Sequence, residues 1–357
     1  MLDLTRLLPG GYCTLLLADH GADVVKIEDT GVGDYGRADP RSFAALSRGK
    51  RSLSVDLKSA GGRDAFLRLV RDADVVVESF RPGVMDRLGV GFDVLSAVNS
   101  TLVYCAITGY GQSGDLAPRA GHDLNYLARA GVLALSGEAS GPPVQAAAQI
   151  ADLAGGALTA AFGIMAALRS GTAQFVDIAM ADGAMSLLGM PAAEYLGGGE
   201  APRRGSLLLG GGVLCYRPYA CADGWVSMGA LEPKFWAAFC AGVGRPDLVS
   251  HQFDPPGSEA HAEVAAVLAA RTRAEWEAFN VEHDCCLEPV LELDEALAAR
   301  PEMVTDGLLS TPVRLSATPA SSSGPVPGLG EHTDEVLREA GLEDADIAAL
   351  RAAGAVR

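Results

Sequence analysis

Short runs of apolar residues, many of them β-branched, alternate with amphipathic stretches through the first hundred residues of the chain. Runs of this length with few polar positions are typical of strands buried on both faces. They occur at residues 22–27, 52–55, 75–77 and 102–107. The stretches between them, at 11–20, 61–72 and 93–98, have helical spacing. This alternation predicts an α/β fold with a parallel, Rossmann-like sheet.

The pattern changes in the second half of the chain. Residues 127–196 are mostly helical in spacing, with one strand expected at 174–178, and a Gly-rich break follows at 197–212. The next segment combines strand-like alternation with helical stretches, which is typical of a small α+β domain. Because 357 residues exceed one ordinary core, we expect a large domain over residues 1–196, a linker over 197–213 and a small α+β domain over 214–301.

The most apolar run, residues 153–168, is rich in Ala and Gly. It is shorter than the roughly 20 residues that a membrane span needs, so we expect a buried core helix and no membrane partner. The first residues lack the basic and apolar regions of a signal peptide. Seven cysteines without a Cys-X-X-Cys pair indicate a reducing, cytoplasmic compartment.

The formal net charge is −17, which argues against a nucleic-acid partner because phosphate binding needs a basic face. Positive charge is nevertheless segregated. A solvated basic face is the ordinary explanation, but in so acidic a chain the segregation favours capture of a phosphate-bearing ligand. The basic side chains are Arg37, Arg41, Arg48, Lys50 and Arg51, with Arg81 and Arg87 in a separate loop.

Two residues carry candidate acid–base chemistry. His122 follows Gly121 at the start of a helix-like segment, where a lone histidine more often caps or fills an interface. Asp152 stands at the start of the apolar run, where an aspartate is an ordinary N-cap, although the same position also stabilises a carboxylate that faces a ligand. A histidine and a carboxylate on opposite sides of a carbon acid can take a proton from one face and return one to the other.

Other chemistries fit the sequence poorly. Residues 109–114 match the Gly-X-Gly-X-X-Gly dinucleotide fingerprint, but residues 115–119 make a poor helix, which argues against nicotinamide or flavin binding. No Gly-X-Ser-X-Gly elbow supports a serine hydrolase. The pair Cys285 and Cys286 beside His283 is more typical of packing than of a thiol nucleophile.

Several motifs resemble those of the family III CoA-transferase superfamily, at residues 4–10, 21–28, 47–53, 78–84, 109–114 and 330–337. The block Gly121-His122-Asp123-Leu124-Asn125-Tyr126, together with Leu231-Glu232-Pro233, resembles the α-methylacyl-CoA racemase branch of that superfamily. The resemblance implies the family III fold, with residues 302–357 returning to the large domain. It also implies an interlocked homodimer whose active site is built from both subunits.

By the same resemblance, His122 and Asp152 are the two bases of a 1,1-proton transfer at the α-carbon of a 2-methylacyl-CoA, through an enolate. The partner subunit's Glu232 would orient His122, and Asp123 would shape the thioester end of the site. No metal or organic cofactor is implied beyond the CoA of the substrate. Racemases of this type commonly carry an arginine where this chain has Asp29, and Arg37 is the expected replacement. The remaining CoA contacts that the resemblance implies are Val55, Asp56, Leu57, Lys58, Ser79, Phe80, Arg81, Arg87, Gly121, Asp123, Leu124, Asn125 and Tyr126.

Two alternatives remain. In a family III CoA-transferase, the aspartate at position 152 would be a nucleophile that forms a mixed anhydride and exchanges CoA between carboxylic acids. Such enzymes typically lack the histidine of the 121–126 block, so His122 with Glu232 favours the racemase. A non-catalytic acyl-CoA-binding protein would leave His122 and Asp152 dispensable. Acyl specificity is not encoded in one motif: Met185, Leu187, Leu188 and Met190 are either an apolar acyl surface or, more commonly, ordinary core.

Overall fold

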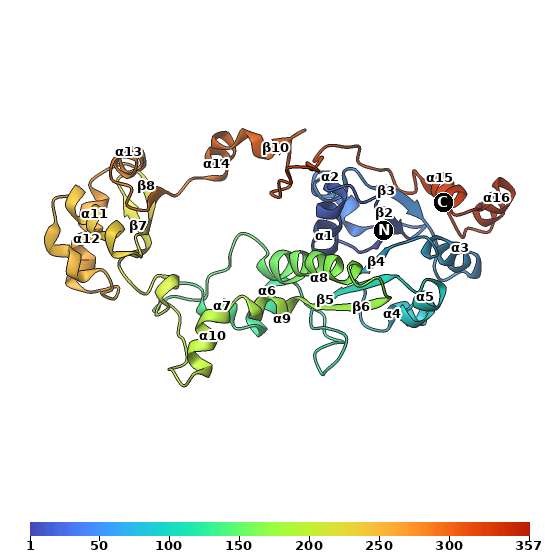
Figure 1. Cartoon of the computed structure of the whole chain (residues 1–357), viewed down its shortest axis with the longest axis horizontal. Helices are drawn as coiled ribbons and strands as arrows, with labels where there is room; N and C mark the ends of the chain where they lie inside the picture. The colour runs from blue at the N-terminus through green and yellow to red at the C-terminus, as the bar shows by residue number, and fades with distance from the viewer. The chain divides into compact units, whose positions relative to one another are not determined.

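The computed structural model describes all 357 residues, and the chain forms two compact units (Figure 1). The first comprises Met1–Ala130, Ala146–Leu187 and Pro301–Arg357, and the second comprises Gly131–Gln145 and Leu188–Arg300. Residues 131–145 and 188–196, which the sequence analysis assigned to the large domain, therefore belong to the second unit.

The first unit is built on a six-stranded parallel sheet with the strand order β3-β2-β1-β4-β5-β6. The predicted α/β class and parallel sheet are confirmed, and the β-branched runs at 75–77 and 102–107 form its centre. Except for Arg51, all positions of β1 to β5 are buried, as expected for a sheet covered on both faces, whereas the edge strand β6 has only Ile178 buried. The strands are β1 (Leu2–Leu4), β2 (Val25–Glu28), β3 (Arg51–Ser54), β4 (Val75–Glu78), β5 (Val103–Thr108) and β6 (Gln174–Ala179).

Helices cover the sheet in two sets. One set packs with the strands in a single apolar core around Phe66, Leu95 and Leu337. It consists of α3 (Ala60–Val70), α5 (Phe92–Val98), α15 (Thr333–Glu339) and α16 (Asp344–Ala352). In the other set, α1 contacts η2 and α8. This set consists of α1 (Leu8–Asp19), α2 (Pro40–Ser47), α6 (Asp123–Arg129), the π-helical segment η2 (Ala151–Leu158), α8 (Thr159–Leu168) and α9 (Met180–Ser186), with the short η1 (Tyr35–Ala38) and α4 (Val84–Arg87) in connecting loops.

The strand order creates a crevice. After β3 the chain returns to the other side of β1 and continues with β4, so the connections that leave β1 and β4 diverge to opposite faces of the sheet. Ligands of open parallel sheets bind outside the carboxyl ends of the strands at such a switch point. The residues that follow β1 and β4 are therefore placed where a ligand would be expected.

The apolar segment from Ala151 to Leu168 is helical, as predicted, but it is only partly buried. Gly155, Ala160 and Ile164 are buried, but the large apolar side chains of Leu158, Phe162, Met165 and Leu168 are exposed, Phe162 at 75%. The predicted buried core helix is therefore buried along one face only, because nothing in the chain covers the face that carries Phe162. By length and composition alone this segment could also cross a membrane, with 39% of it buried, a test that core helices pass as well.

The second unit has its own core beneath a three-stranded antiparallel sheet, β7-β8-β9. Trp236 and Trp276 are fully buried, and their indole N–H groups donate to the carbonyls of Leu248 (3.0 Å) and Leu268 (2.8 Å). Cys285 is buried in this core, consistent with a packing role. The elements are α7 (Val132–Leu135), α10 (Gly189–Leu196), η3 (Leu208–Gly210), β7 (Tyr216–Cys221), β8 (Gly224–Gly229), α11 (Pro233–Gly242), η4 (Pro246–His251), α12 (Glu259–Ala269), α13 (Arg273–His283), β9 (Leu287–Pro289) and α14 (Leu293–Ala299).

The chain then returns to the first unit through η5 (Pro301–Met303) and the two-stranded ribbon of β10 (Val304–Thr305) and β11 (Leu308–Leu309). Near its end, Val356 bridges Val55 next to β3, and the carbonyl of Ala355 accepts from the N–H of Asp56 (2.8 Å). The C-terminal helices are therefore part of the first core.

Close backbone contact between η2 and α9 depends on two glycines. A Cβ at Gly183 would lie 2.1 Å from the carbonyl oxygen of Gly155, far inside van der Waals contact.

We expect Gly183→Ala to lower the free energy of unfolding by about 1–3 kcal/mol, measured by urea denaturation. The matched control is Gly189→Ala in α10, where no atom lies within 4 Å of the added Cβ. It should not destabilise, and equal stability of the two variants would contradict the close contact.

Candidate functional site

A pocket of about 620 Å³ opens at the carboxyl edge of the parallel sheet. Its walls come from the segments that follow β1, β4 and β5, from the start of α6, and from η2 and α9. This is the crevice that the strand order predicts. The residues that line it are Arg6, Leu7, Leu8, Pro9, Ser79, Phe80, Arg81, Pro82, Ile107, Thr108, Gly109, Ala117, Arg119, Ala120, Gly121, His122, Asn125, Tyr126, Asp152 and Met180.

The pocket brings His122 and Asp152 together, although thirty residues separate them in the sequence. His122 is the N-cap residue of α6, and its N–H donates to the side-chain oxygen of Asn125 (3.1 Å). Asp152 lies in the first turn of η2. The link between the two helices is Asp123, whose buried carboxylate accepts from the backbone N–H groups of Ala151 (2.7 Å) and Asp152 (3.0 Å). One side chain thus fixes the start of η2 next to the start of α6.

The surroundings of Asp152 make it a weak acid near neutrality. Burial, and then the negative charge of Asp123, raise the pKa of Asp152 to about 6, while His122 opposes the shift. The same groups act on Tyr126, because burial and the charge of Asp152 raise the pKa of its phenol to about 12. The Tyr126 hydroxyl donates to the carbonyl of Gly121, and its ring meets Tyr110 edge-on at 5.2 Å. Tyr126 therefore stays neutral and holds the loop in front of His122.

Three arginines give the pocket its positive charge. Arg6 pairs with Asp29 (2.9 Å) and lies over the rings of Tyr35 (4.9 Å) and Phe80 (5.6 Å). The side chains of Arg81 and Arg119 form no ion pair in the chain. Two unpaired guanidinium groups in the lining of a pocket can bind an anionic ligand, so the local charge opposes the acidic character of the whole chain.

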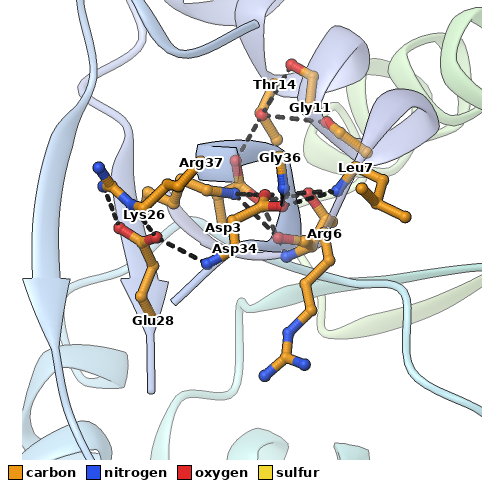
Figure 2. A network of polar contacts seen from close by, with 12 residues as sticks. Asp3, Arg6, Leu7, Gly11, Thr14, Lys26, Glu28, Asp34, Gly36 and Arg37 are labelled. Atoms are coloured by element: carbon orange, nitrogen blue, oxygen red, sulfur yellow. Dashed lines mark hydrogen bonds and ion pairs between the residues drawn. The ribbon is translucent and has the colours of Figure 1, made fainter. Parts of the chain in front are cut away.

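Most of the basic cluster predicted from the sequence is engaged in ion pairs within the fold. Arg37 is held by Glu28 through two hydrogen bonds of 2.7 and 2.6 Å (Figure 2). Its guanidinium lies over the ring of Phe43 (4.1 Å), and Arg37 does not line the pocket. Three other members are engaged with acids of the fold: Arg48 with Asp19, Lys50 with Asp3, and Arg51 with Asp23, Glu335 and Glu339. Only Arg41 forms no ion pair, so internal pairs account for most of the segregated charge without any ligand.

The other predicted site residues divide into two groups. Ser79, Phe80, Arg81, Gly121, Asn125 and Tyr126 line the pocket. The residues that do not line it are Asp123 and Leu124, in α6, Val55, Asp56, Leu57 and Lys58, after β3, and Arg87, in α4. Glu232 belongs to the second unit, where it is the exposed N-cap residue of α11 with no side-chain cap hydrogen bond.

The residues that follow β1 are site residues that were not predicted from the sequence. Arg6, Leu7, Leu8 and Pro9 form one wall of the pocket. The signal was present, because residues 4–10 form one of the family-like motifs and follow a strand whose carboxyl end meets that of β4. Arg119 and Met180, which also line the pocket, had no comparable signal. No group of three or more His, Cys, Asp or Glu residues that could hold a metal ion occurs in the chain.

The arrangement can perform acid–base chemistry. It combines an imidazole with a carboxyl group whose pKa is about 6 in one pocket, and groups that titrate near neutrality are efficient in proton transfer. The backbone N–H groups of Asp123 and Leu124, in the first turn of α6, have no acceptor in the chain, and donors of this kind can stabilise an oxyanion, but neither residue lines the pocket. Those of Ala151 and Asp152 are occupied by Asp123.

Comparison with known proteins gives a consistent result. The sequence profile of CoA-transferase family III matches residues 1–333. The chain is 38% identical to the α-methylacyl-CoA racemase of Mus musculus, over 98% of this chain and 94% of that protein. It is 34% identical to a succinyl-CoA:mesaconate CoA-transferase of Haloarcula marismortui, over 96% of each. The fold is similar to the crystal structure of a CAIB/BAIF family protein from Brucella suis, with a TM-score of 0.81, 27% identity and coverage of 95% and 97%.

The burial of Asp152 and the nearby charge of Asp123 predict how the Asp152 carboxyl group titrates. Its carboxyl signal, followed by ¹³C NMR, should titrate with a midpoint of about 6. Asp123→Asn should lower this midpoint, because it removes the negative charge that disfavours ionisation of Asp152. Asp177→Asn, outside the pocket lining, should leave it unchanged. A wild-type midpoint of about 4, the value of an ordinary aspartate, would contradict the proposed coupling.

Proposed function

The chain belongs to CoA-transferase family III, and we propose that it is a racemase that interconverts (2R)- and (2S)-2-methylacyl-CoA thioesters. The relatives include both racemases and CoA-transferases that act on acyl-CoA thioesters. The observation that carries the choice is that His122 and Asp152 line one pocket. A racemase needs two groups that exchange protons with one carbon, whereas acyl transfer through an anhydride needs one nucleophile.

The proposed reaction is a 1,1-proton transfer. One base removes the α-proton of the thioester, the enolate oxygen is stabilised by the free N–H groups at the start of α6, and the other base returns a proton to the opposite face. His122 acts on one enantiomer and Asp152 on the other. A pKa of about 6 suits Asp152 for both roles, because it is mostly ionised at pH 7 and is still a stronger base than an ordinary carboxylate.

The cations of the pocket are suited to bind the CoA part of the substrate. Arg81 and Arg119 line the pocket without a carboxylate partner, and they are suited to bind the phosphates of CoA. Racemases commonly carry an arginine at the position of Asp29. Arg6 forms an ion pair with Asp29 and lines the pocket, so we propose that Arg6 takes the role of that arginine. We propose no cofactor beyond the CoA of the substrate, and a cytoplasmic location, as the composition predicts.

The second candidate function is CoA transfer through an aspartyl anhydride at Asp152. It is favoured by the relatives that are named CoA-transferases and by the partial exposure of the Asp152 carboxylate in the pocket. It gives His122 no role in the chemistry. The two functions therefore differ in what happens when no acceptor acid is present.

The deciding experiment uses (2S)-2-methylacyl-CoA in deuterated water without an acceptor acid. We expect deuterium at the α-carbon, which mass spectrometry measures, and formation of the (2R) epimer, which chiral chromatography measures. His122→Ala and Asp152→Ala should each slow epimer formation by about 10²-fold or more. His251→Ala, which removes an exposed histidine outside the pocket lining, should retain the wild-type rate. Absence of exchange, combined with CoA transfer once a carboxylic acid is added, would make Asp152 a nucleophile and reject the racemase.

We also propose a homodimer in which the partner subunit's Glu232 orients His122. The outward apolar side chains of η2 and α8, Leu158, Phe162 and Met165, form an exposed stripe of the kind that marks protein interfaces. Met185, Leu187 and Met190 are exposed as well, so they are not the ordinary core that their composition suggests. Glu232 is free of any cap interaction in its own chain, as a residue that acts in a second subunit would be.

Sedimentation velocity tests the dimer. Phe162→Glu places a charge in the stripe, and we expect it to raise the dimer dissociation constant at least about 10-fold, because burying an unpaired charge costs several kcal/mol. Val94→Glu replaces an exposed apolar residue of α5, away from the stripe, and should leave the dimer intact. A wild-type monomer, or a Phe162→Glu dimer as stable as the wild type, would contradict this interface.

A further inference from the structure

One wall of the pocket is formed by a residue in a strained conformation. Leu7, the N-cap residue of α1, has φ 63° and ψ −149°, a region of backbone space that is essentially confined to glycine. It lines the pocket that holds His122 and Asp152. Such strain persists only where the surrounding structure fixes the backbone, so the contacts of this turn identify what holds Leu7 in place.

A buried ion pair holds the turn from both sides (Figure 2). The Asp34 carboxylate accepts from the backbone N–H of Leu7 (3.1 and 3.3 Å). It also pairs with the Lys26 ammonium at 2.7 Å, and both side chains are almost fully buried. Lys26 in turn donates to the carbonyl oxygen of Thr5 (2.9 Å). One pair of side chains thus binds the backbone immediately before Arg6 and immediately after it.

The turn also separates two cavities. Leu7 and Leu8 line the pocket of His122 and Asp152, and they line a second cavity of about 360 Å³ whose walls include Lys26, Asp34 and Phe43. The backbone position of Leu7 therefore decides how far the first pocket extends toward α2. A relaxed turn would change the shape of the wall that a ligand meets.

Stability alone gives little reason for a lysine–aspartate pair at this position. The desolvation of two buried charges can exceed their attraction, and apolar residues of similar volume often stabilise a fold equally well or better. Apolar side chains could not hold the Leu7 N–H and the Thr5 carbonyl at once. The ion pair is suited to a task that requires directed hydrogen bonds.

We propose that Lys26 and Asp34 are positioning residues, which hold Leu7 in its strained conformation and thereby preset the pocket wall that faces the substrate. The proposal rests on the proposed function only in taking an acyl-CoA thioester as the ligand. Without the pair, Leu7 relaxes to negative φ, and Arg6 and Leu7 leave the pocket lining. Binding then has to restore the strained turn, and the affinity falls.

The test compares two buried ion pairs of the same unit. Asp34→Asn removes the charge that holds Leu7, and Asp19→Asn removes the partner of Arg48, a pair of 2.8 Å that is equally buried but lies off the pocket. Binding of a 2-methylacyl-CoA is measured by calorimetry, and unfolding by urea. We expect both variants to lose stability, but only Asp34→Asn to raise the Kd, by about tenfold, with Asp19→Asn within about twofold of wild type.

Equal dissociation constants in the two variants would overturn the positioning role. Failure of the wild type to bind any acyl-CoA would instead reject the proposed function, and the stability test below would still decide the inference. Because binding is measured rather than turnover, a CoA-transferase would give the same result as a racemase.

A second pair of variants covers the case in which Asp34→Asn does not fold. Leu7→Ala and Leu7→Gly both remove the side chain, but only glycine accepts φ 63° without strain. We expect Leu7→Gly to unfold at a higher urea concentration than Leu7→Ala, the reverse of the usual order of these residues. The ordinary order, with the alanine variant more stable, would show that the turn is not held under strain and would overturn the proposal.

Discussion

The site depends on the carboxylate of Asp123. It accepts hydrogen bonds from the first two N–H groups of η2, Ala151 and Asp152, while its own backbone begins α6 directly after His122. A buried carboxylate that caps a helix N-terminus is favourable because the donors there lack partners within the helix. The same contact places a second negative charge near Asp152 and contributes to its raised pKa. Geometry and acidity therefore have a common origin in one side chain.

Ion pairs within the fold also decide which basic side chains are available to a ligand. Most basic residues among the first fifty form ion pairs with acidic residues of the same chain, for example Lys26 with Asp34 and Lys50 with Asp3. What remains free at the pocket is Arg81 and Arg119. An acidic protein can in this way present a positive pocket to an anionic ligand, because the field near the ligand is set by the nearest unpaired charges rather than by the net charge.

Much of the fold could be predicted because local sequence agrees with the final structure. The apolar runs at 75–77 and 102–107 became β4 and β5, and the helical spacing at 61–72 became α3. The segment from Ala151 to Leu168 shows the limit of this reasoning. Composition indicated an apolar helix, but it could not show that Phe162 points outward and that η2 winds as a π-helix. Which face of an all-apolar helix is covered depends on its neighbours, and these come from distant parts of the chain.

The sequence by itself determined the class of the fold, the family motifs and the chemical types of the candidate bases, because these follow from residue identity and short-range periodicity. It also indicated His122 and Asp152 as candidate bases. Only the tertiary structure decided that they share a pocket, that Arg37 is bound to Glu28 instead of lining that pocket, and that Arg6 and Leu7 form its wall. The physical reason is that ion pairs and pocket walls join residues far apart in the chain. Sequence shows which charges exist, whereas packing selects their partners.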